Sequence, residues 1–158
     1  MEEPLVKIHY WLYPVSWIYG IGAYLRNKLF DWGYYQSKSF DVPVVCVGNL
    51  AVGGTGKTPH TEYLIKLLQQ TGANVAMLSR GYKRKSKGYV LATEKTDVKR
   101  IGDEPYQIKT KFPDIRVAVD ENRCHGIEQL MKLDNPKVDV VLLDDAYQHR
   151  HVKAGLNI

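Results

Sequence analysis

Residues 42–59 read VPVVCVGNLAVGGTGKTP and join an apolar run to a glycine-rich loop and the start of a helical pattern. The apolar run is typical of a strand that is covered on both faces of a sheet. The segment that follows, TPHTEYLIKLLQQTG (residues 58–72), places three leucines on one helical face, with a proline near its start and a glycine at its end. This order of strand, loop and helix predicts an α/β fold that presents the loop at one edge of a sheet.

The loop GGTGKT has the composition of a phosphate-binding loop. Glycines permit positive φ angles and close approach of the backbone, so that several N–H groups and a helix N-terminus can face a phosphate. Lys57 would then reach the β- and γ-phosphates of a nucleotide, and Thr58 would offer its hydroxyl to Mg²⁺. Ala51 stands where the strict pattern has glycine, so the match is to the variant G-G-x-G-K-T. The alternative is a glycine-rich turn that only caps a helix. The predicted nucleotide-binding residues are Gly53, Gly54, Thr55, Gly56, Lys57 and Thr58.

Beyond residue 41, short β-rich runs alternate with helical segments, which predicts a P-loop NTPase-like, mostly parallel sheet flanked by helices over residues 41–158. GLNI (residues 155–158) has the pattern of a strand that is just beginning, so we expect the sequence to be part of a longer protein. The other expected strands are 73–80, 88–93, 115–120 and 138–148, and the other expected helices are 103–112 and 122–133.

The segment VVLLDDAYQHR (residues 140–150) is an apolar run that ends in two aspartates. Such a Walker B strand places an aspartate beside the phosphate loop, where it holds Mg²⁺ or its water. Since the carboxyl ends of parallel strands converge on the ligand crevice, Asp144 and Asp145 are expected near Lys57 and Thr58, with Thr58 and Asp144 as the metal ligands. An aspartate that caps a following helix is the alternative.

Two further stretches contain clusters of charged residues, one acidic and one basic. In GDEP (residues 102–105), Asp103 could act as a base toward an attacking hydroxyl, or could stabilise the start of a helix together with Glu104. In SRGYKRKSKG (residues 79–88), five basic residues follow one another closely. Such a run is typical of a solvated loop, and contact with a substrate phosphate or a membrane is the alternative.

The first 36 residues hold ten of the 17 aromatic residues, including every tryptophan. Residues 8–25 carry no formal charge, but Pro14 and the polar and glycine positions argue against a helix that spans a bilayer. Trp and Tyr favour the headgroup level, and Arg26 and Lys28 suit anionic headgroups. We therefore expect residues 1–40 to form an aromatic-rich helical segment that associates with a membrane surface; packing of these rings on the domain is the alternative.

The bulk composition is that of an ordinary soluble domain. With 158 residues, 44% of them hydrophobic, the chain can bury one core. The net charge of +5 suits anionic partners, and no nucleic-acid partner is expected from it. Cys46 and Cys124 fit neither a disulfide framework nor a metal-ligand spacing. The sequence does not indicate an oligomeric state.

Taken in order, VPVVCVGNLAVGGTGKTP, LSRGY, GDEP, VAVDENR and DDAYQHR resemble the motifs of the tetraacyldisaccharide 4'-kinases, the lipid A kinases of Gram-negative bacteria. The resemblance covers essentially the whole chain and includes the aromatic N-terminus. It implies transfer of the γ-phosphoryl group of ATP, with Mg²⁺, to the 4'-hydroxyl of a tetraacyldisaccharide 1-phosphate at the cytoplasmic face of the inner membrane.

The resemblance also implies roles for individual residues. Lys57 and Thr58 would serve the phosphates and Mg²⁺, Asp103 would be the base, and the pair Asp144 and Asp145 would organise the metal and the reacting groups. Family members continue through a second half that supplies a histidine partner to the base. The residues expected to contact the substrate are Arg80, Gln148, His149 and Arg150.

Some positions depart from the family pattern, and two other functions stay open. Lys83 and Arg84 stand where the family commonly has glycines, and Ala146 and Tyr147 where it often has Gly-Phe. A partitioning-type ATPase would share the G-G-x-G-K-T loop, but usually has a lysine at the position of Val52. A soluble small-metabolite kinase would have little reason to expose an aromatic N-terminus.

Overall fold

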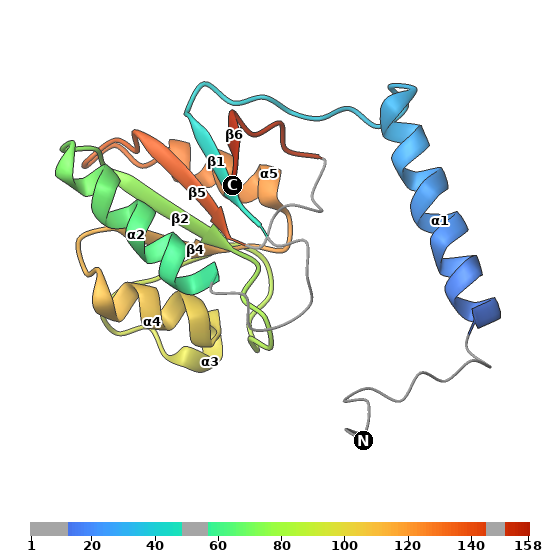
Figure 1. Ribbon diagram of the computed structural model, residues 1–158. Coiled ribbons are helices and arrows are strands. Elements are labelled where there is room, and N and C mark those ends of the chain that lie inside the picture. Colours follow the sequence, from blue (N-terminus) through green and yellow to red (C-terminus); the bar gives the residue numbers. More distant parts are fainter. Residues whose placement is uncertain (1–12, 49–56, 145–150) are drawn as a thin grey trace, which may run out of the picture. The chain divides into compact units, whose positions relative to one another are not determined.

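The computed structural model describes residues 13–48, 57–144 and 151–158 (Figure 1). The chain divides into two compact units, residues 1–36 and 37–158. The first unit contains the helix α1 (Tyr13–Asp31). Pro14 lies in its first turn, where a missing N–H costs no helical hydrogen bond. Across the described part of the chain, no helix combines the length and the apolar character needed to cross a membrane.

The second unit is built on one six-stranded sheet with the order β3-β4-β2-β5-β1-β6. All neighbouring strands are parallel except β3, which runs antiparallel to β4. The expected P-loop NTPase-like, mostly parallel sheet is therefore confirmed. The strands are β1 (Val44–Val47), β2 (Val75–Ser79), β3 (Val90–Leu91), β4 (Arg116–Val119), β5 (Val140–Asp144) and β6 (Leu156–Asn157).

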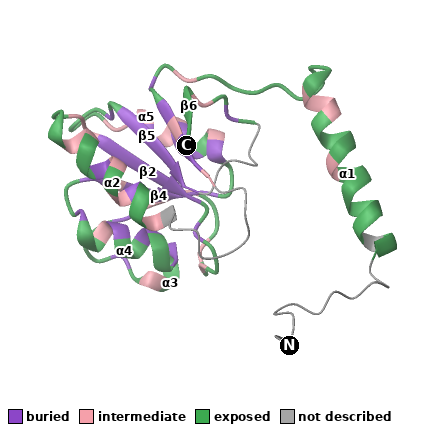
Figure 2. Cartoon of the chain, in the orientation of Figure 1, coloured by how far each residue is buried: buried purple, intermediate pink, exposed green. Residues whose placement is uncertain are grey.

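Helices cover both faces of this sheet and create two apolar layers. One layer joins the sheet to α2, α3 and α4 through Ile65, Ile101 and Ile108, and the other joins it to α5 through Ile127 and Leu130. The two central strands, β2 and β5, are buried along their whole length, as Figure 2 shows in purple. The helices are α2 (Lys57–Gln70), α3 (Val98–Ile101), α4 (Asp103–Lys111) and α5 (Arg123–Met131).

Most expected elements are present, with two differences. The strand expected over 88–93 is reduced to Val90–Leu91 and pairs antiparallel at the edge of the sheet, because no helix separates it from β2 and the chain reaches the edge through a loop. The single turn α3 was not predicted, since four residues are too few to establish a helical period. At the end of α2, Gly72 has φ +79° and donates its N–H to the carbonyl of Gln69, as expected of a C-terminal cap.

Candidate active site

The strand that leads into the phosphate loop lies directly beside the strand that ends in Asp144. In the parallel pair of β1 and β5, Val47 is opposite Asp144. Strands in such a pair are roughly 4.8 Å apart, so the start of the loop and this carboxylate are close neighbours. The chain returns from the loop as α2, whose first two residues are Lys57 and Thr58. Of the residues expected to converge here, the structure describes Thr58 and Asp144, and both line one pocket.

A narrow pocket lies where these elements meet. Its polar lining comes from Thr58 and Thr61 on α2, Glu104 on α4 and Asp144 on β5, over an apolar floor of Met77 and Ile108. Asp144 is only 6% exposed, and Thr61 is 1% exposed. The Thr61 hydroxyl has no hydrogen-bond partner among the described residues, which is unusual for a buried polar atom. The pocket therefore combines two carboxylates with two hydroxyls, one of them unsatisfied.

The oxygen atoms of this pocket are of the kind that bind Mg²⁺, but the pocket as it stands has no room for a water molecule, so its side chains would have to move apart to admit the ion. Mg²⁺ prefers oxygen ligands, and proteins commonly supply only one or two carboxylates while phosphates and waters complete its octahedron. Thr58, Glu104 and Asp144 offer such oxygens from three different elements. Among the residues that the structure describes, no group of three His, Cys, Asp or Glu side chains could hold a metal by itself.

Asp103 and Glu104 occupy the first two positions of α4 and are both exposed, and of the two only Glu104 lines the pocket. Both carboxylates lie in the first turn of the helix, where they interact favourably with its dipole. The helix-stabilising interpretation and the catalytic one are therefore compatible at Asp103. Gly102 precedes it with φ +90° and accepts a hydrogen bond at its carbonyl from the N–H of Tyr106, at 3.2 Å.

The RGY and GDEP motifs contact each other through their glycines. A Cβ atom on Gly102 would lie 2.9 Å from the carbonyl oxygen of Tyr82, and one on Gly81 would lie 2.8 Å from that of Ile101. Both glycines also have positive φ angles, +70° at Gly81 and +90° at Gly102. Only glycine allows the two backbones to approach this closely. This packing fixes the start of α4, and with it Asp103 and Glu104, against the loop that follows β2.

We expect Gly102→Ala to destabilise the fold by about 2–4 kcal/mol, because it adds backbone strain and a contact with a carbonyl that cannot move away. Gly88 provides a matched control. It has φ +69° but open space around its Cβ position, so Gly88→Ala should cost only about 1 kcal/mol. Chemical denaturation measures both values. Equal losses in the two variants would show that the close approach of the motifs contributes nothing.

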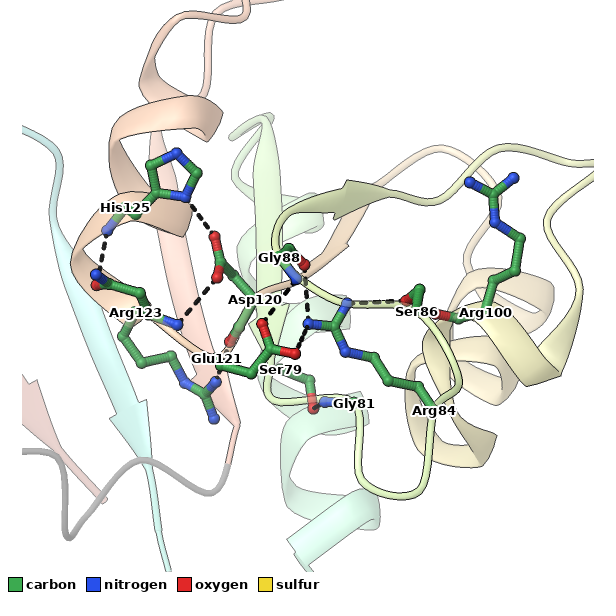
Figure 3. A network of polar contacts seen from close by, with 11 residues as sticks. Ser79, Gly81, Arg84, Ser86, Gly88, Arg100, Asp120, Glu121, Arg123 and His125 are labelled. Carbon is green, nitrogen blue, oxygen red and sulfur yellow. Dashed lines mark hydrogen bonds and ion pairs between the residues drawn. The ribbon is translucent and has the colours of Figure 1, made fainter.

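A buried arginine ties the VAVDENR motif to the same edge of the sheet. Arg123, 3% exposed, donates from Nη1 to the carbonyl of Asp120 at 2.6 Å and from Nη2 to the carbonyl of Asp144 at 3.4 Å. The Asp120 carboxylate contacts His125 Nδ1 at 2.6 Å and accepts from the N–H of Asn122 at 2.9 Å (Figure 3). Because Arg123 reaches the backbone of Asp144, it couples the ends of β4 and β5.

The basic stretch after β2 forms a loop that is held by an ion pair between the buried Arg84 and the half-exposed Glu121. Arg84 Nη2 lies 2.7 Å from Glu121 Oε1 and also donates to the carbonyl of Gly88 at 2.8 Å, while Nη1 donates to Ser86 Oγ at 3.1 Å (Figure 3). The side chain of Arg84 is only 3% exposed. This arginine is therefore structural, unlike the solvated residue that the charge run predicted. Arg80 is exposed at the mouth of the loop.

Several predicted residues lie outside the described part of the chain, and the side chain of Lys57 is also not described. Three residues of the site were not predicted individually: Thr61, Glu104 and Arg123. Glu104 lies in the GDEP motif and Arg123 in the VAVDENR motif, so these motifs pointed to both residues. Nothing in the sequence distinguishes Thr61. The predicted residues outside the description are Gly53, Gly54, Thr55, Gly56, Asp145, Gln148, His149 and Arg150.

Comparison with known proteins agrees with this arrangement. The family model for tetraacyldisaccharide-1-P 4'-kinase (LpxK) matches residues 8–158. The chain is 70% identical to the tetraacyldisaccharide 4'-kinase of Bacteroides fragilis strain YCH46, over 100% of this chain and 42% of that protein. The corresponding protein of Bacteroides thetaiotaomicron is 68% identical over 100% of this chain and 41% of its own length.

A solved structure is also similar. It is the "apo" form of LpxK from Aquifex aeolicus in complex with ATP, with a TM-score of 0.82 and 42% sequence identity over 92% of this chain and 46% of that one. The chain thus spans less than half the length of these relatives. The match to the family model extends over almost all of its residues, and the chain belongs to the tetraacyldisaccharide-1-P 4'-kinase (LpxK) family.

Proposed function

We propose that the protein is an ATP-dependent kinase that phosphorylates the 4'-hydroxyl of a tetraacyldisaccharide 1-phosphate, a step of lipid A biosynthesis. The observation that carries the proposal is the pocket in which Thr58, Glu104 and Asp144 meet beside the start of the phosphate loop. The names of the similar proteins and the ATP in the similar crystal structure support the donor and the acceptor.

The residues divide into a donor side and a reacting centre. On the donor side, residues 53–58 hold the phosphates of ATP, with Lys57 neutralising charge on the β- and γ-phosphates. Thr58 and Asp144, with Glu104, would hold Mg²⁺, which neutralises charge that develops on the phosphate oxygens. Asp145 orients the reacting groups beside Asp144. Asp103 accepts the proton of the 4'-hydroxyl as that oxygen attacks the γ-phosphorus.

The acceptor is proposed to bind along the same edge of the sheet. Arg80 directly follows β2, the neighbour of β5, and is an exposed residue. In the sequence, the motif that follows Asp145 contains a second group of polar residues. The further residues proposed to contact the acceptor are Gln148, His149 and Arg150.

The experiment that tests this function follows labelled phosphate from ATP in the complete protein, including any continuation beyond residue 158. We expect the label to appear on the lipid disaccharide only when protein, Mg²⁺ and acceptor are all present. Release of free phosphate without a labelled lipid would contradict the kinase and favour a nucleotide-dependent ATPase. Transfer to a water-soluble sugar with no requirement for acyl chains would favour a soluble small-metabolite kinase.

We further propose that residues 1–40 associate with the cytoplasmic face of the inner membrane, while residues 41–158 form the kinase domain. Support comes from α1, on which Trp17, Ile21 and Tyr24 recur at helical spacing and are all exposed. Lys28 follows one turn later, with its Nζ 5.7 Å from the centre of the Tyr24 ring. Aromatic rings beside a cation suit the headgroup level of an anionic bilayer.

Deleting residues 1–36, which form a compact unit of their own, should lower binding to anionic vesicles by roughly tenfold or more. The reason is that several aromatic rings would insert into the bilayer and each would contribute to the binding. Replacing Trp17, Ile21 and Tyr24 together by serine should have a similar effect without shortening the chain. Co-sedimentation with vesicles measures both. Unchanged partitioning of the deleted protein would contradict membrane association through this segment.

A further inference from the structure

The loop between β2 and β3 encloses a second pocket, and the proposed transfer reaction does not use its lysines. This pocket, called here the basic pocket, has a volume of about 410 Å³. Five basic side chains and one carboxylate line it, together with small and aromatic residues. Its charged residues are Arg80, Lys83, Arg84, Lys85, Lys87 and Glu121.

The one carboxylate of the basic pocket is already satisfied. Desolvation opposes ionisation of Glu121, but hydrogen bonds from backbone N–H groups, including that of Gly88 at 2.9 Å, and the Arg84 guanidinium hold its pKa below the usual value. The charge of Arg84 is neutralised by its ion pair with Glu121. Among the described residues, the remaining cations form no ion pair. They are Arg80, Lys83, Lys85 and Lys87.

Lys83 stands at a backbone position that favours glycine. Its φ is +58°, and it is the only non-glycine residue with a positive φ in the described chain. A side chain in this region costs free energy relative to glycine, and strain of this kind gathers at functional sites. The Lys83 Nζ lies 5.3 Å from the centre of the exposed Tyr82 ring, at the lining of the pocket. A lysine here supplies a charge that glycine could not.

The basic pocket lies at the same edge of the sheet as the pocket lined by Thr58, Glu104 and Asp144, which is called here the transfer site. Its loop leaves β2 after Ser79, and β2 is the immediate neighbour of β5, with Leu78 opposite Leu143. Since parallel strands are about 4.8 Å apart, the loop begins only about 10 Å from the strand that enters the phosphate loop. One acceptor molecule of the size of a disaccharide can therefore extend from one site to the other.

We propose that the basic pocket binds a phosphate monoester that the acceptor already carries, and so positions its free hydroxyl at the transfer site. The inference rests on the proposed function, because it takes the acceptor to be a phosphorylated lipid sugar. A phosphate monoester carries a charge of about −1.5 to −2 at neutral pH, which several unpaired lysines can neutralise. A concave pocket stiffened by the Arg84–Glu121 pair suits one discrete phosphate better than a plane of lipid headgroups.

The test compares two acceptors in the complete protein, a lipid disaccharide with its phosphate and the same molecule without it. Lys83→Gly, Lys85→Gln and Lys87→Gln should each raise the KM for the phosphorylated acceptor about five- to tenfold, since each removes one charge-assisted contact. The kcat should change by less than about twofold, because the lost contact binds the acceptor equally in the ground state and in the transition state. The KM for the unphosphorylated acceptor should stay the same in every variant.

Controls separate this effect from unfolding and from general electrostatics. Lys83→Gly relieves the backbone strain, so its melting temperature should not fall. Lys95→Gln removes an exposed lysine that does not line the basic pocket and should leave both KM values unchanged. If the pocket variants raise both KM values equally, the proposal is wrong.

Two further arms identify the source of the phosphate and protect the test from failure of the kinase assay. Vesicles of phosphatidylglycerol carry headgroup phosphodiesters only. If the three variants weaken binding to these vesicles but leave the KM for the phosphorylated acceptor in detergent unchanged, the pocket binds bulk lipid and the proposal is overturned. Calorimetric titration with the phosphorylated acceptor, without ATP, should show weaker binding in the variants even if no phosphoryl transfer is found; that result would reject the kinase but retain the pocket.

Discussion

Asp144→Asn is expected to lower the kcat for phosphoryl transfer by roughly a thousandfold, the scale of losing one main electrostatic contact to a reacting phosphate. Asn has nearly the same shape as Asp, so the buried end of β5 and its pairing with β1 should survive. What disappears is a negative charge from the pocket that Thr58 and Glu104 also line, where Mg²⁺ is proposed to bind. The magnesium concentration needed for half-maximal rate should rise as well.

Asp139→Asn is the matched control for this prediction. Asp139 directly precedes β5 at the opposite end of the same strand, and its Oδ2 accepts hydrogen bonds from the backbone and side chain of Asn74 at 2.8 and 2.7 Å. Asparagine retains an acceptor oxygen, so this variant should keep kcat and the magnesium requirement. Steady-state kinetics with varied Mg²⁺ measures both proteins. A normal turnover of Asp144→Asn would show that Asp144 serves packing alone.

Asp103→Asn should lower kcat by roughly 10²- to 10⁴-fold while the KM for ATP changes by less than about twofold, as expected when a general base is lost. Its position explains the selectivity. Asp103 is exposed at the start of α4, and it does not line the pocket that Thr58 and Asp144 share. If Asp103 is the base, as proposed, loss of its charge should affect the attacking hydroxyl rather than the nucleotide.

Glu104→Gln at the next position is the informative comparison. Glu104 faces the pocket, so this variant should raise the magnesium requirement and recover much of its kcat when Mg²⁺ is saturating. Each substitution removes one charge from the first turn of α4 and costs the helix a similar amount, about 0.3–1 kcal/mol. If Asp103→Asn weakens ATP binding as much as it lowers kcat, Asp103 belongs to the structure or to the metal site, and the base lies elsewhere.

Much of the site could be predicted because its residues adjoin strand ends. The apolar runs before the phosphate loop and before Asp144 indicate buried strands, and parallel strands bring their carboxyl ends to one edge. That reasoning placed Thr58 and Asp144 together correctly. It could not choose between Asp103 and Glu104, since adjacent positions at a helix start differ only in the direction they face.

The edge of the sheet and the basic loop were harder to predict for a different reason. The two-residue strand Val90–Leu91 forms because it pairs with β4. Two residues are too few to show the alternation of apolar and polar residues that predicts a strand. Arg84 reads as one solvated cation in a run of five, yet Glu121, 37 positions later in the chain, withdraws it from solvent. Contacts between such distant positions leave no mark in a single sequence.

The sequence by itself determined the mostly parallel sheet, the strand–loop–helix unit and the family, because apolar periodicity and glycine placement are local properties that specify local structure. Only the tertiary structure decided that Glu104 rather than Asp103 lines the pocket and that Gly81 and Gly102 hold two motifs in contact. It also decided that four cations around the basic pocket have no ion-pair partner within residues 13–48, 57–144 and 151–158. These facts depend on which surfaces meet when the layers pack, and packing joins residues whose separation along the chain carries no signal.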